Sequence, residues 1–312
     1  MAKSRIARIN GKMYDLGTRN KSFVEVAHQL KLKGVKNFYF MLELNDVSLI
    51  NVDPFAVDKD GRVNLTRDQI SRVINECAIN PWYFLREVCL LPDQGGKPVH
   101  YKANRGNIAQ AYLSLHSFDS WLTITRQSGK TMSFLALLEW VYSFGTTDSE
   151  FIFLNKSGDD CKKNLDRVRS LIDLLPEYMR FKYIITEEGK TEKGKDNATF
   201  MSHPITHNSI RTTAKASTPD AAMKLGRGLT VPVIFSDETE FTDYIDVIMA
   251  NAFMAFKTAS DNAKRNHAFT CRAFTSTPKS QIGAFILNIN FTHLAFKIPL
   301  NAGKPLMRQS AA

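Results

Sequence analysis

The stretch Thr125-Arg126-Gln127-Ser128-Gly129-Lys130-Thr131 decides the fold class, because it joins two runs of different periodicity. Trp121 to Thr125 before it is a β-type run, and Met132 to Tyr142 after it is helical. Strand, Gly-Lys-Thr and helix in this order form a loop that binds nucleotide phosphates. Backbone N–H groups of the turn, the lysine charge and the threonine hydroxyl would hold phosphate and Mg²⁺. The motif therefore predicts a triphosphate ligand.

The match to the usual phosphate-loop pattern is incomplete. A glycine is expected five residues before Gly129, where this chain has Ile124. Because Gly-Lys-Thr also occurs by chance, the alternative is an ordinary helix start with the Lys130 side chain in solvent. Other motifs must decide between these interpretations.

Length and composition limit the class of protein. A chain of 312 residues with 44% hydrophobic residues fits one large α/β domain with appendages, or two domains. No apolar run reaches the length of a membrane span, so we expect a cytosolic protein. The cysteines are far apart without zinc-like spacing, which favours buried free thiols over a disulfide frame or a metal site: Cys77, Cys89, Cys161 and Cys271.

The net charge of +10 is concentrated at the two ends of the chain. Residues 1–37 carry nine Lys and Arg against two acids, and residues 241–312 carry eight against three. Sequence-independent nucleic-acid binding depends mainly on such charges. The ends therefore indicate contact with a polyanion, and the alternative is a pair of solvated basic tails.

The N-terminal part predicts mostly helices. We expect a helix over 22–32, a strand over 37–44, and a helix from Thr66, whose capping box with Gln69 fixes its start. A further amphipathic helix is expected over 82–90. The loop that follows separates an N-terminal segment over 1–95, with a basic arm and a helical, lid-like region, from a core over 96–285 and a basic tail over 286–312.

Helices and strands alternate in the core, which predicts a mainly parallel central sheet flanked by crossover helices. The expected helices are 104–117, 131–142 and 158–175, and the expected strands are 121–125, 151–154, 231–236 and 267–274. A hairpin is expected over 198–213.

Two of these strands end in reactive side chains. Asp237 and Glu238 follow the apolar run 231–236, and a strand end is where a parallel-sheet ATPase holds its carboxylates. Asp237 would hold Mg²⁺ and Glu238 would orient the attacking water. The strand 267–274 runs into Thr275-Ser276-Thr277-Pro278, which would place hydroxyl groups beside the γ-phosphate. A solvated acidic turn is the alternative for Asp237-Glu238 alone.

Together these motifs resemble the ATPase domain of the large terminase subunit of tailed bacteriophages, the motor that packs DNA into proheads. That family carries Arg-Gln before x-Gly-Lys-Thr and lacks the first glycine. The matching stretches keep the family's order over about residues 80–285: 126–131, Asp173-Leu174-Leu175-Pro176-Glu177, Ala216-Ser217-Thr218-Pro219-Asp220-Ala221, Arg227-Gly228, Asp237-Glu238 and Ser276-Thr277-Pro278. The resemblance implies a P-loop NTPase fold of the ASCE type, with ATP and Mg²⁺ as cofactors.

The resemblance also implies roles for single residues. Gln127, Ser128, Gly129, Lys130 and Thr131 would bind the phosphates, with Thr131 and Asp237 at the metal. Glu238 would be catalytic, and the candidates for transition-state charge stabilisation are Arg126 and Arg227. Ser276, Thr277 and Pro278 would couple the γ-phosphate state to movement on DNA.

Two features depart from the family's pattern. The family's Tyr/Phe-Gln pair, which reads adenine, is missing, and the nearest amides are Asn107 and Gln110. Large terminases also continue into a nuclease domain with several metal-binding acids, whereas residues 280–312 contain no Asp or Glu. We therefore expect no nuclease activity from this chain.

The resulting hypothesis is an ATP-hydrolysing motor that moves double-stranded DNA, without sequence preference, into a prohead. The resemblance implies a portal protein and a small terminase subunit as partners, a homo-oligomeric ring on the prohead, and a location in the host cytoplasm. Two alternatives stay open: a helicase-like ATPase stimulated by nucleic acid, and a non-catalytic fragment that binds DNA or a partner.

Overall fold

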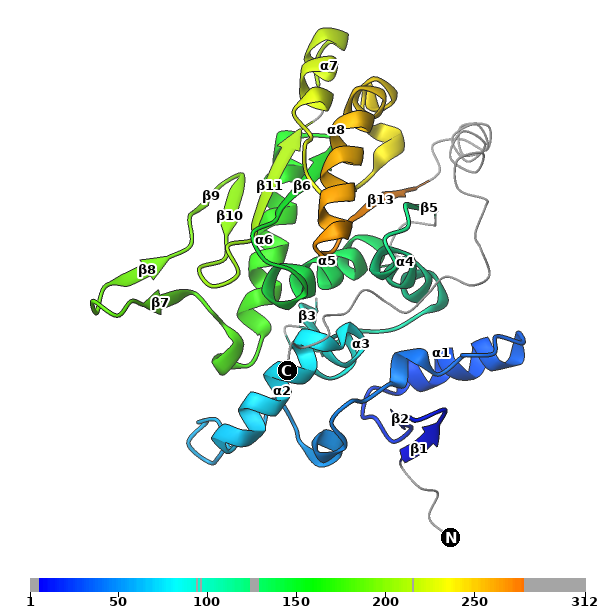
Figure 1. The fold of residues 1–312 in the computed structure, drawn as a ribbon, viewed down its shortest axis with the longest axis vertical. Coiled ribbons are helices and arrows are strands. Elements are labelled where there is room, and N and C mark those ends of the chain that lie inside the picture. The colour runs from blue at the N-terminus through cyan, green and yellow to red at the C-terminus, as the bar shows by residue number, and fades with distance from the viewer. Residues whose placement is uncertain (1–5, 94, 96, 124–128, 215, 278–312) are drawn as a thin grey trace. The chain divides into compact units, whose positions relative to one another are not determined.

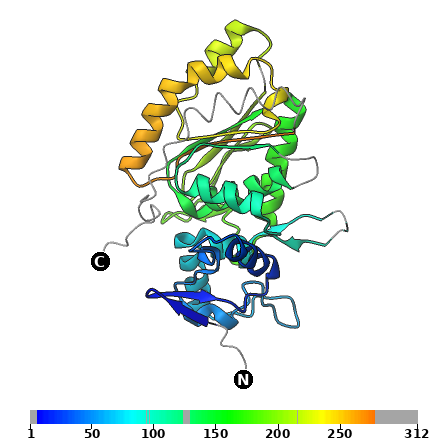
Figure 2. The ribbon, with the colours of Figure 1, turned by 90° about the vertical axis from the view of Figure 1, so that its right-hand side faces the viewer.

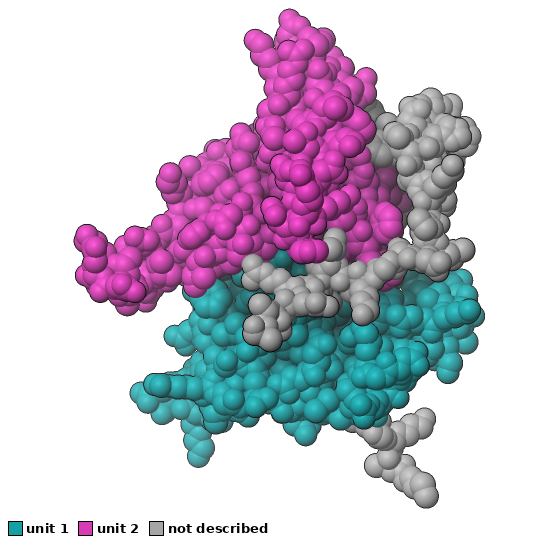
Figure 3. All heavy atoms as spheres, viewed as in Figure 1, with its two compact units in different colours: residues 1–105, 135–145, 168–181 teal, residues 106–134, 146–167, 182–312 magenta. Residues whose placement is uncertain are grey.

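A computed structural model describes residues 6–93, 95, 97–123, 129–214 and 216–277. Figure 1 gives the course of the chain, and Figure 3 colours its two compact units. Unit 1 comprises residues 1–105, 135–145 and 168–181, and unit 2 comprises residues 106–134, 146–167 and 182–312. The predicted boundaries at residues 95 and 285 stay predictions.

Unit 1 is mainly helical. Its strands form two short hairpins: β1 (Ile6–Ile9) with β2 (Lys12–Asp15), and β3 (Leu90–Leu91) with β4 (Val99–His100). Its complete α-helices are α1 (Lys21–Leu32), α2 (Arg67–Ile79) and α3 (Pro81–Tyr83), and it also contains the C-terminal parts of α5 (Lys130–Trp140) and α6 (Gly158–Leu174). Shorter helical turns complete it: η1 (Phe40–Leu42), η2 (Val47–Asn51), η5 (Glu177–Met179) and the π-helices η3 (Phe84–Val88) and η4 (Val141–Gly145).

The capping box predicted at the start of α2 is confirmed. Thr66 Oγ1 accepts from the Gln69 N–H at 3.2 Å, and the Gln69 side chain accepts from the Thr66 N–H at 2.9 Å. The helix predicted over 22–32 is confirmed as α1. These two helices begin where the sequence places them, because local capping and periodicity are sufficient there.

One expectation for unit 1 is wrong, and a second is correct except for the end of the helix. The strand expected over 37–44 is replaced by turns and η1, in which the adjacent residues Met41 and Leu42 are both buried. In a strand, the side chains of Met41 and Leu42 would point to opposite faces. The helical turn therefore buries more apolar surface than a strand would. The helix expected over 82–90 ends at Val88, because Leu90 and Leu91 pair with β4.

Glu139, on α5 (Lys130–Trp140), is a fully buried carboxyl group in unit 1. Its Oε2 accepts from the Cys89 thiol at 3.7 Å, and its Oε1 makes no hydrogen bond among the described residues. Burial raises the pKa of Glu139 to about 8, because the charged form loses its hydration. Glu139 is therefore protonated in the folded protein at neutral pH.

We expect Glu139→Gln to flatten the pH dependence of the free energy of unfolding. The folded pKa of about 8 lies above the ordinary glutamate value of 4.5, so between these pH values the folded chain holds a proton that the unfolded chain releases. Stability then falls as pH rises, by up to about 1.4 kcal/mol per pH unit. Urea unfolding at pH 5 and pH 7.5 measures the slope, with Glu177→Gln as the matched control. An equal slope in the wild type and in Glu139→Gln would contradict the prediction.

Unit 2 contains a seven-stranded sheet in the order β5-β13-β12-β6-β11-β10-β9. The five strands from β5 to β11 are parallel, and β10 and β9 are antiparallel additions. The strands are β5 (Ser120–Thr123), β6 (Glu150–Asn155), β9 (Asp196–Asn197), β10 (Phe200–Ser202), β11 (Ser209–Ala214), β12 (Val233–Ser236) and β13 (Cys271–Ser276), with a separate hairpin of β7 (Tyr183–Ile185) and β8 (Thr191–Lys193). The remaining elements are α4 (Arg105–Leu115), α6 (Gly158–Leu174), α7 (Pro219–Arg227), η6 (Thr239–Phe241) and α8 (Ile245–Arg265). The predicted fold class, a mainly parallel sheet flanked by helices, is confirmed.

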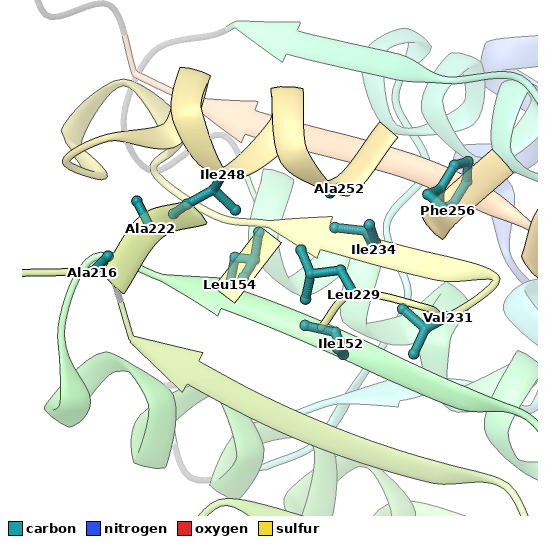
Figure 4. Close-up of a cluster of buried hydrophobic side chains, with 10 residues drawn as sticks. All are labelled: Ile152, Leu154, Ala216, Ala222, Leu229, Val231, Ile234, Ile248, Ala252 and Phe256. Carbon is teal, nitrogen blue, oxygen red and sulfur yellow. The ribbon is translucent and has the colours of Figure 1, made fainter. Parts of the chain in front are cut away.

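The central strands of unit 2 are buried on both faces, as expected for a parallel sheet covered by helices. Figure 4 shows Ile152, Leu154 and Ile234 pointing to the side of α7 and α8, where they pack with Ile248 and Phe256. On the other face, Phe235 stacks on Phe134 of α5 with ring centroids 3.9 Å apart, and Phe153 packs edge-on against it at 4.5 Å. In Figure 2, α8 (yellow to orange) lies along one side of the sheet.

Gly226 allows α7 and α8 to approach closely. A Cβ atom at this position would lie 2.4 Å from the Ile248 carbonyl oxygen and 2.8 Å from Asn251 Cβ. The glycine thereby fixes the C-terminal end of α7, where Arg227 is exposed.

Candidate nucleotide site

Three parallel strands of unit 2 bring the predicted site residues to one edge of the sheet. β13 lies between β5 and β12, with Ser276 opposite Thr123 and Phe274 opposite Ser236. The residues that follow these strands therefore share the carboxyl edge, where ligands of open α/β sheets bind.

The described end of the phosphate loop has the geometry that its sequence requires. Gly129 has a φ of 77°, a conformation that favours glycine, and α5 begins at Lys130. The Ser133 N–H donates to the Gly129 carbonyl oxygen at 2.9 Å, which closes the first helical turn. Arg126, Gln127 and Ser128 lie outside the described residues, so their predicted roles stay predictions.

Lys130 is buried at this edge rather than exposed to solvent. Only 6% of its surface is accessible, and its Nζ donates to Thr277 Oγ1 at 2.8 Å. The ammonium group also forms an ion pair with Glu238 Oε1 at 3.3 Å. The alternative interpretation of Gly-Lys-Thr, a helix start with lysine in solvent, is therefore wrong.

Thr131 and Asp237 form the second contact between the phosphate-loop helix and β12. Thr131 Oγ1 lies 2.9 Å from Asp237 Oδ2 and 3.1 Å from Oδ1, and it donates to this carboxylate. The Asp237 N–H donates to the Leu154 carbonyl oxygen of β6 at 3.2 Å, which anchors the residue to the sheet. A hydroxyl group and a carboxylate therefore lie together beside the buried Lys130.

Glu238 takes an uncommon backbone conformation immediately after Asp237. Its φ of 51° is left-handed, which few residues other than glycine adopt, and such positions cluster at functional sites. Its side chain, 25% exposed, accepts from the N–H and from the Oγ1 of Thr277, each at 3.3 Å. The turn thus directs this carboxylate towards β13 and Lys130.

The donor set fits a Mg²⁺ triphosphate. Mg²⁺ in nucleotide sites is usually held by one or two carboxylates together with phosphate oxygens and water, not by an all-protein cage. The site has that composition, with the Asp237 carboxylate, the Thr131 hydroxyl and the Lys130 ammonium group. Within the described ranges, no three or more His, Cys, Asp or Glu side chains form a group that could hold a metal ion. A metal ion at this site would therefore also need ligands from the nucleotide and water.

The other predicted residues lie at different places in unit 2. Ser276 belongs to the same strand end, where its Oγ accepts from the Glu240 N–H at 3.2 Å. Asn107 and Gln110 are buried on α4, whereas Arg227 ends α7. Among the described residues, no contact joins Gln110 or Arg227 to Lys130 or Glu238, and Pro278 lies outside the described residues.

The sequence places Thr275 in the run of hydroxyl residues expected beside the γ-phosphate, but it does not predict that Thr275 contacts Asp237. Its hydroxyl group donates to Asp237 Oδ1 at 2.6 Å and is fully buried. The only signal was its position, one residue before Ser276 and at the end of a strand. A hydroxyl residue at a strand end is common, so its partner could be found only once β13 was placed beside β12.

No protein-family model matches the sequence, and no curated protein matches it. Among solved structures, the chain is similar to the large terminase of bacteriophage HK97, with 16% identity, a TM-score of 0.43, and 73% of this chain and 42% of that chain covered. An ATPase-domain mutant of the Thermus phage P74-26 large terminase gives 16% identity, a TM-score of 0.37, and coverage of 58% and 67%. The large terminase of another thermophilic bacteriophage gives 10% identity, a TM-score of 0.38, and coverage of 55% and 38%.

The chain spans less than half of the length of the HK97 protein, and the same holds for the third of these terminases. At such low identities and TM-scores, the roles of individual residues depend on the geometry of this chain.

Proposed function

We propose that the chain is an ATP-hydrolysing motor domain that moves double-stranded DNA into a viral prohead. One observation carries the proposal. Lys130 at the start of α5, Glu238 after β12 and Thr277 after β13 form a closed set of contacts of 2.8 to 3.3 Å. The Thr131–Asp237 hydrogen bond lies next to it along the chain, at 2.9 Å. A phosphate loop, a metal carboxylate and a candidate catalytic base meet there.

Phosphate binding is assigned to the start of α5. The buried Lys130 ammonium group would exchange Thr277 and Glu238 for phosphate oxygens, and the helix N-terminus adds backbone N–H donors. Thr131 and Asp237 would hold Mg²⁺. When bound, Mg²⁺ neutralises phosphate charge and polarises the transferred phosphoryl group. Gln127, Ser128 and Gly129 complete the loop by resemblance.

Glu238 is assigned as the residue that orients and deprotonates the attacking water. A general base must lie within hydrogen-bond reach of its water, and this carboxylate is one-quarter exposed beside the lysine that would bind phosphate. Its two contacts with Thr277 give it a defined direction. Partial exposure and a fixed direction are expected of a general base rather than of a buried carboxylate with a structural role.

Gln110 is the stronger of the two candidates for reading the nucleotide base. Its side chain is 2% exposed, and neither carboxamide atom has a hydrogen-bond partner among the residues that the structure describes. Buried polar groups are rarely left unpaired, so this amide needs a ligand or a water molecule. Asn107, 6% exposed, lies on the same buried side of α4, one turn earlier.

The arginines are assigned by resemblance and position. Arg126 belongs to the phosphate loop and would act within its own chain. Arg227 is exposed at the end of α7, held there by the close α7–α8 contact at Gly226. An exposed arginine on a fixed helix end is suited to reach the nucleotide of a neighbouring copy in a ring.

Ser276 and Thr277, with Pro278, are assigned to coupling. Thr277 Oγ1 accepts from Lys130 and donates to Glu238, so a change of partner at Lys130 reaches β13 directly. A triphosphate that takes Lys130 from Thr277 would leave the hydroxyl group to Glu238 alone. Through this exchange of hydrogen bonds, nucleotide binding would change the contacts of Thr277 at the end of β13.

The proposed partners are double-stranded DNA, a portal protein and a small terminase subunit. Basic side chains support the first of these: Lys31, Lys33 and Lys36 are exposed at the end of α1, and no acid occurs between Glu25 and Glu43. In the part of the chain that the structure describes, no helix has the length and apolar character needed to cross a membrane.

ATP turnover with and without linear double-stranded DNA tests the proposed function, with a strand-unwinding assay run beside it. We expect DNA to stimulate hydrolysis without strand separation. Unwinding would instead support the helicase-like alternative, and a complete lack of hydrolysis would support a non-catalytic DNA- or partner-binding fragment. Incubation with supercoiled plasmid and Mg²⁺ should leave the plasmid intact.

DNA binding should be independent of sequence and strongly dependent on salt. If about three phosphates are contacted, affinity falls about 40-fold between 50 and 200 mM salt, because each contact releases counterions. Replacing Lys31, Lys33 and Lys36 with Gln should lower the slope of log affinity against log salt by about 2.7. The matched control replaces Lys190, Lys193 and Lys195, which lie in and beside the β7–β8 hairpin of balanced charge. Equal slopes for the two triple variants would contradict the assignment of α1.

A further inference from the structure

β13 ends in Thr275 and Ser276, and Thr277 follows the strand directly. Each of these three hydroxyl residues contacts a different residue of the segment after β12. Thr275 Oγ1 donates to Asp237 Oδ1 at 2.6 Å. Ser276 Oγ accepts from the Glu240 N–H at 3.2 Å, and Thr277 Oγ1 donates to Glu238 at 3.3 Å. The proposed coupling residues begin at Ser276, so the contact of Thr275 with the metal carboxylate has no assigned role.

Thr275 is held firmly in place. Its side chain is fully buried, and its carbonyl oxygen accepts from Thr239 Oγ1 at 3.2 Å. The Thr239 hydroxyl group also lies 3.1 Å from the Ser236 carbonyl oxygen, so it ties the ends of β12 and β13 together. A hydroxyl donor on such a support, with a short bond to a charged acceptor, makes a strong and well-directed hydrogen bond.

The two oxygens of Asp237 have unequal surroundings. Oδ1 lies within hydrogen-bond distance of Thr275 Oγ1, of the Glu238 N–H at 3.1 Å and of Thr131 Oγ1 at 3.1 Å. Among the described residues, Oδ2 accepts only from Thr131, at 2.9 Å. A carboxylate oxygen has about two lone-pair sites, so Oδ1 is saturated and Oδ2 keeps free capacity.

We infer that Thr275 is a positioning residue for the metal site: its hydroxyl group fixes the rotation of the Asp237 carboxylate and leaves Oδ2 available to a Mg²⁺ nucleotide. The inference rests on the proposed function, because it takes Asp237 as the metal carboxylate. Without the hydroxyl group, Oδ1 loses its closest donor and the carboxylate can turn. Loss of such a supporting hydrogen bond typically lowers metal affinity about 10- to 100-fold.

The test compares Thr275→Val, which keeps the shape but removes the hydroxyl group, with Thr275→Ser, which keeps the hydroxyl group. Affinity for a fluorescent, non-hydrolysable ATP analogue is titrated in Mg²⁺ and in excess EDTA, and Mn²⁺ binding to the same complex is followed by electron paramagnetic resonance. We expect Thr275→Val to weaken Mn²⁺ binding and the Mg²⁺-dependent gain in affinity about 10-fold, with nearly unchanged affinity in EDTA. Thr275→Ser should stay within about three-fold of the wild type, since it keeps the hydroxyl group that supports the metal carboxylate.

Thr212→Val is the matched control, because it removes a buried hydroxyl group from β11 of the same sheet, which contacts the Thr199 carbonyl oxygen rather than Asp237. Normal metal dependence in Thr275→Val would overturn the inference alone. Equal losses in Mg²⁺ and in EDTA would also overturn it, since Thr275 would then be structural. If the wild type binds no nucleotide, the proposed function itself fails. Should Thr275→Val not fold, Thr275→Ala provides the same comparison.

Discussion

Lys130→Ala should abolish ATP hydrolysis and weaken nucleotide binding. Lys130 is 6% exposed, and its ammonium group forms an ion pair with Glu238. Hydrogen bonds from a charged donor to phosphate are worth about 1.5–3 kcal/mol each, so we expect kcat/KM to fall at least about 100-fold. Steady-state phosphate release and titration with a fluorescent ATP analogue measure the two effects.

Lys163→Ala is the control for this prediction, because it removes an exposed lysine from α6 in the same unit. Its turnover should stay within about two-fold of the wild type, as expected for an exposed surface residue. A Lys130→Ala variant that keeps more than about a tenth of wild-type turnover would rule out the phosphate-loop assignment, since a loss that small is below the value of one charged hydrogen bond.

The sequence predicted the positions of the unit 2 strands along the chain better than their order in the sheet. The run from Val231 to Phe235 is continuously apolar because both faces of β12 are covered, and such a run marks a buried strand whatever its partners. The local hydrophobic pattern could not predict that β13 lies between β5 and β12, because contacts between residues distant in the sequence set the strand order. The Lys130–Thr277 and Thr275–Asp237 hydrogen bonds depend on that order.

Errors occurred where packing overrides local preference. Residues 37–44 are rich in aromatic and apolar side chains and favour a strand, but two adjacent residues, Met41 and Leu42, both pack into the core of unit 1. The strand expected from residue 267 begins only at Cys271, because α8 continues to Arg265 and His267 takes a left-handed φ of 55°. The turn at Met41 and the turn at His267 both lack a sequence signal as strong as the capping box at Thr66.

Glu238→Gln should separate hydrolysis from binding. Glutamine keeps the shape of the side chain but cannot accept a proton from water, so we expect hydrolysis to fall at least about 100-fold, as for a lost general base. The substitution also removes the 3.3 Å ion pair between Glu238 and Lys130. Lys130 is then free to bind phosphate, and affinity for the ATP analogue should stay equal to that of the wild type or rise.

Glu240→Gln makes the same chemical change two residues later, within η6, and is the matched control for Glu238→Gln. Its turnover should stay within a few-fold of the wild type, because its backbone N–H, not its carboxylate, makes the contact with Ser276. Single-turnover hydrolysis and equilibrium binding on the same preparations separate the two effects of Glu238→Gln. If nucleotide affinity collapsed together with the rate, Glu238 would be a metal ligand or a structural partner of Lys130, and the catalytic base would have to be sought elsewhere at this edge of the sheet.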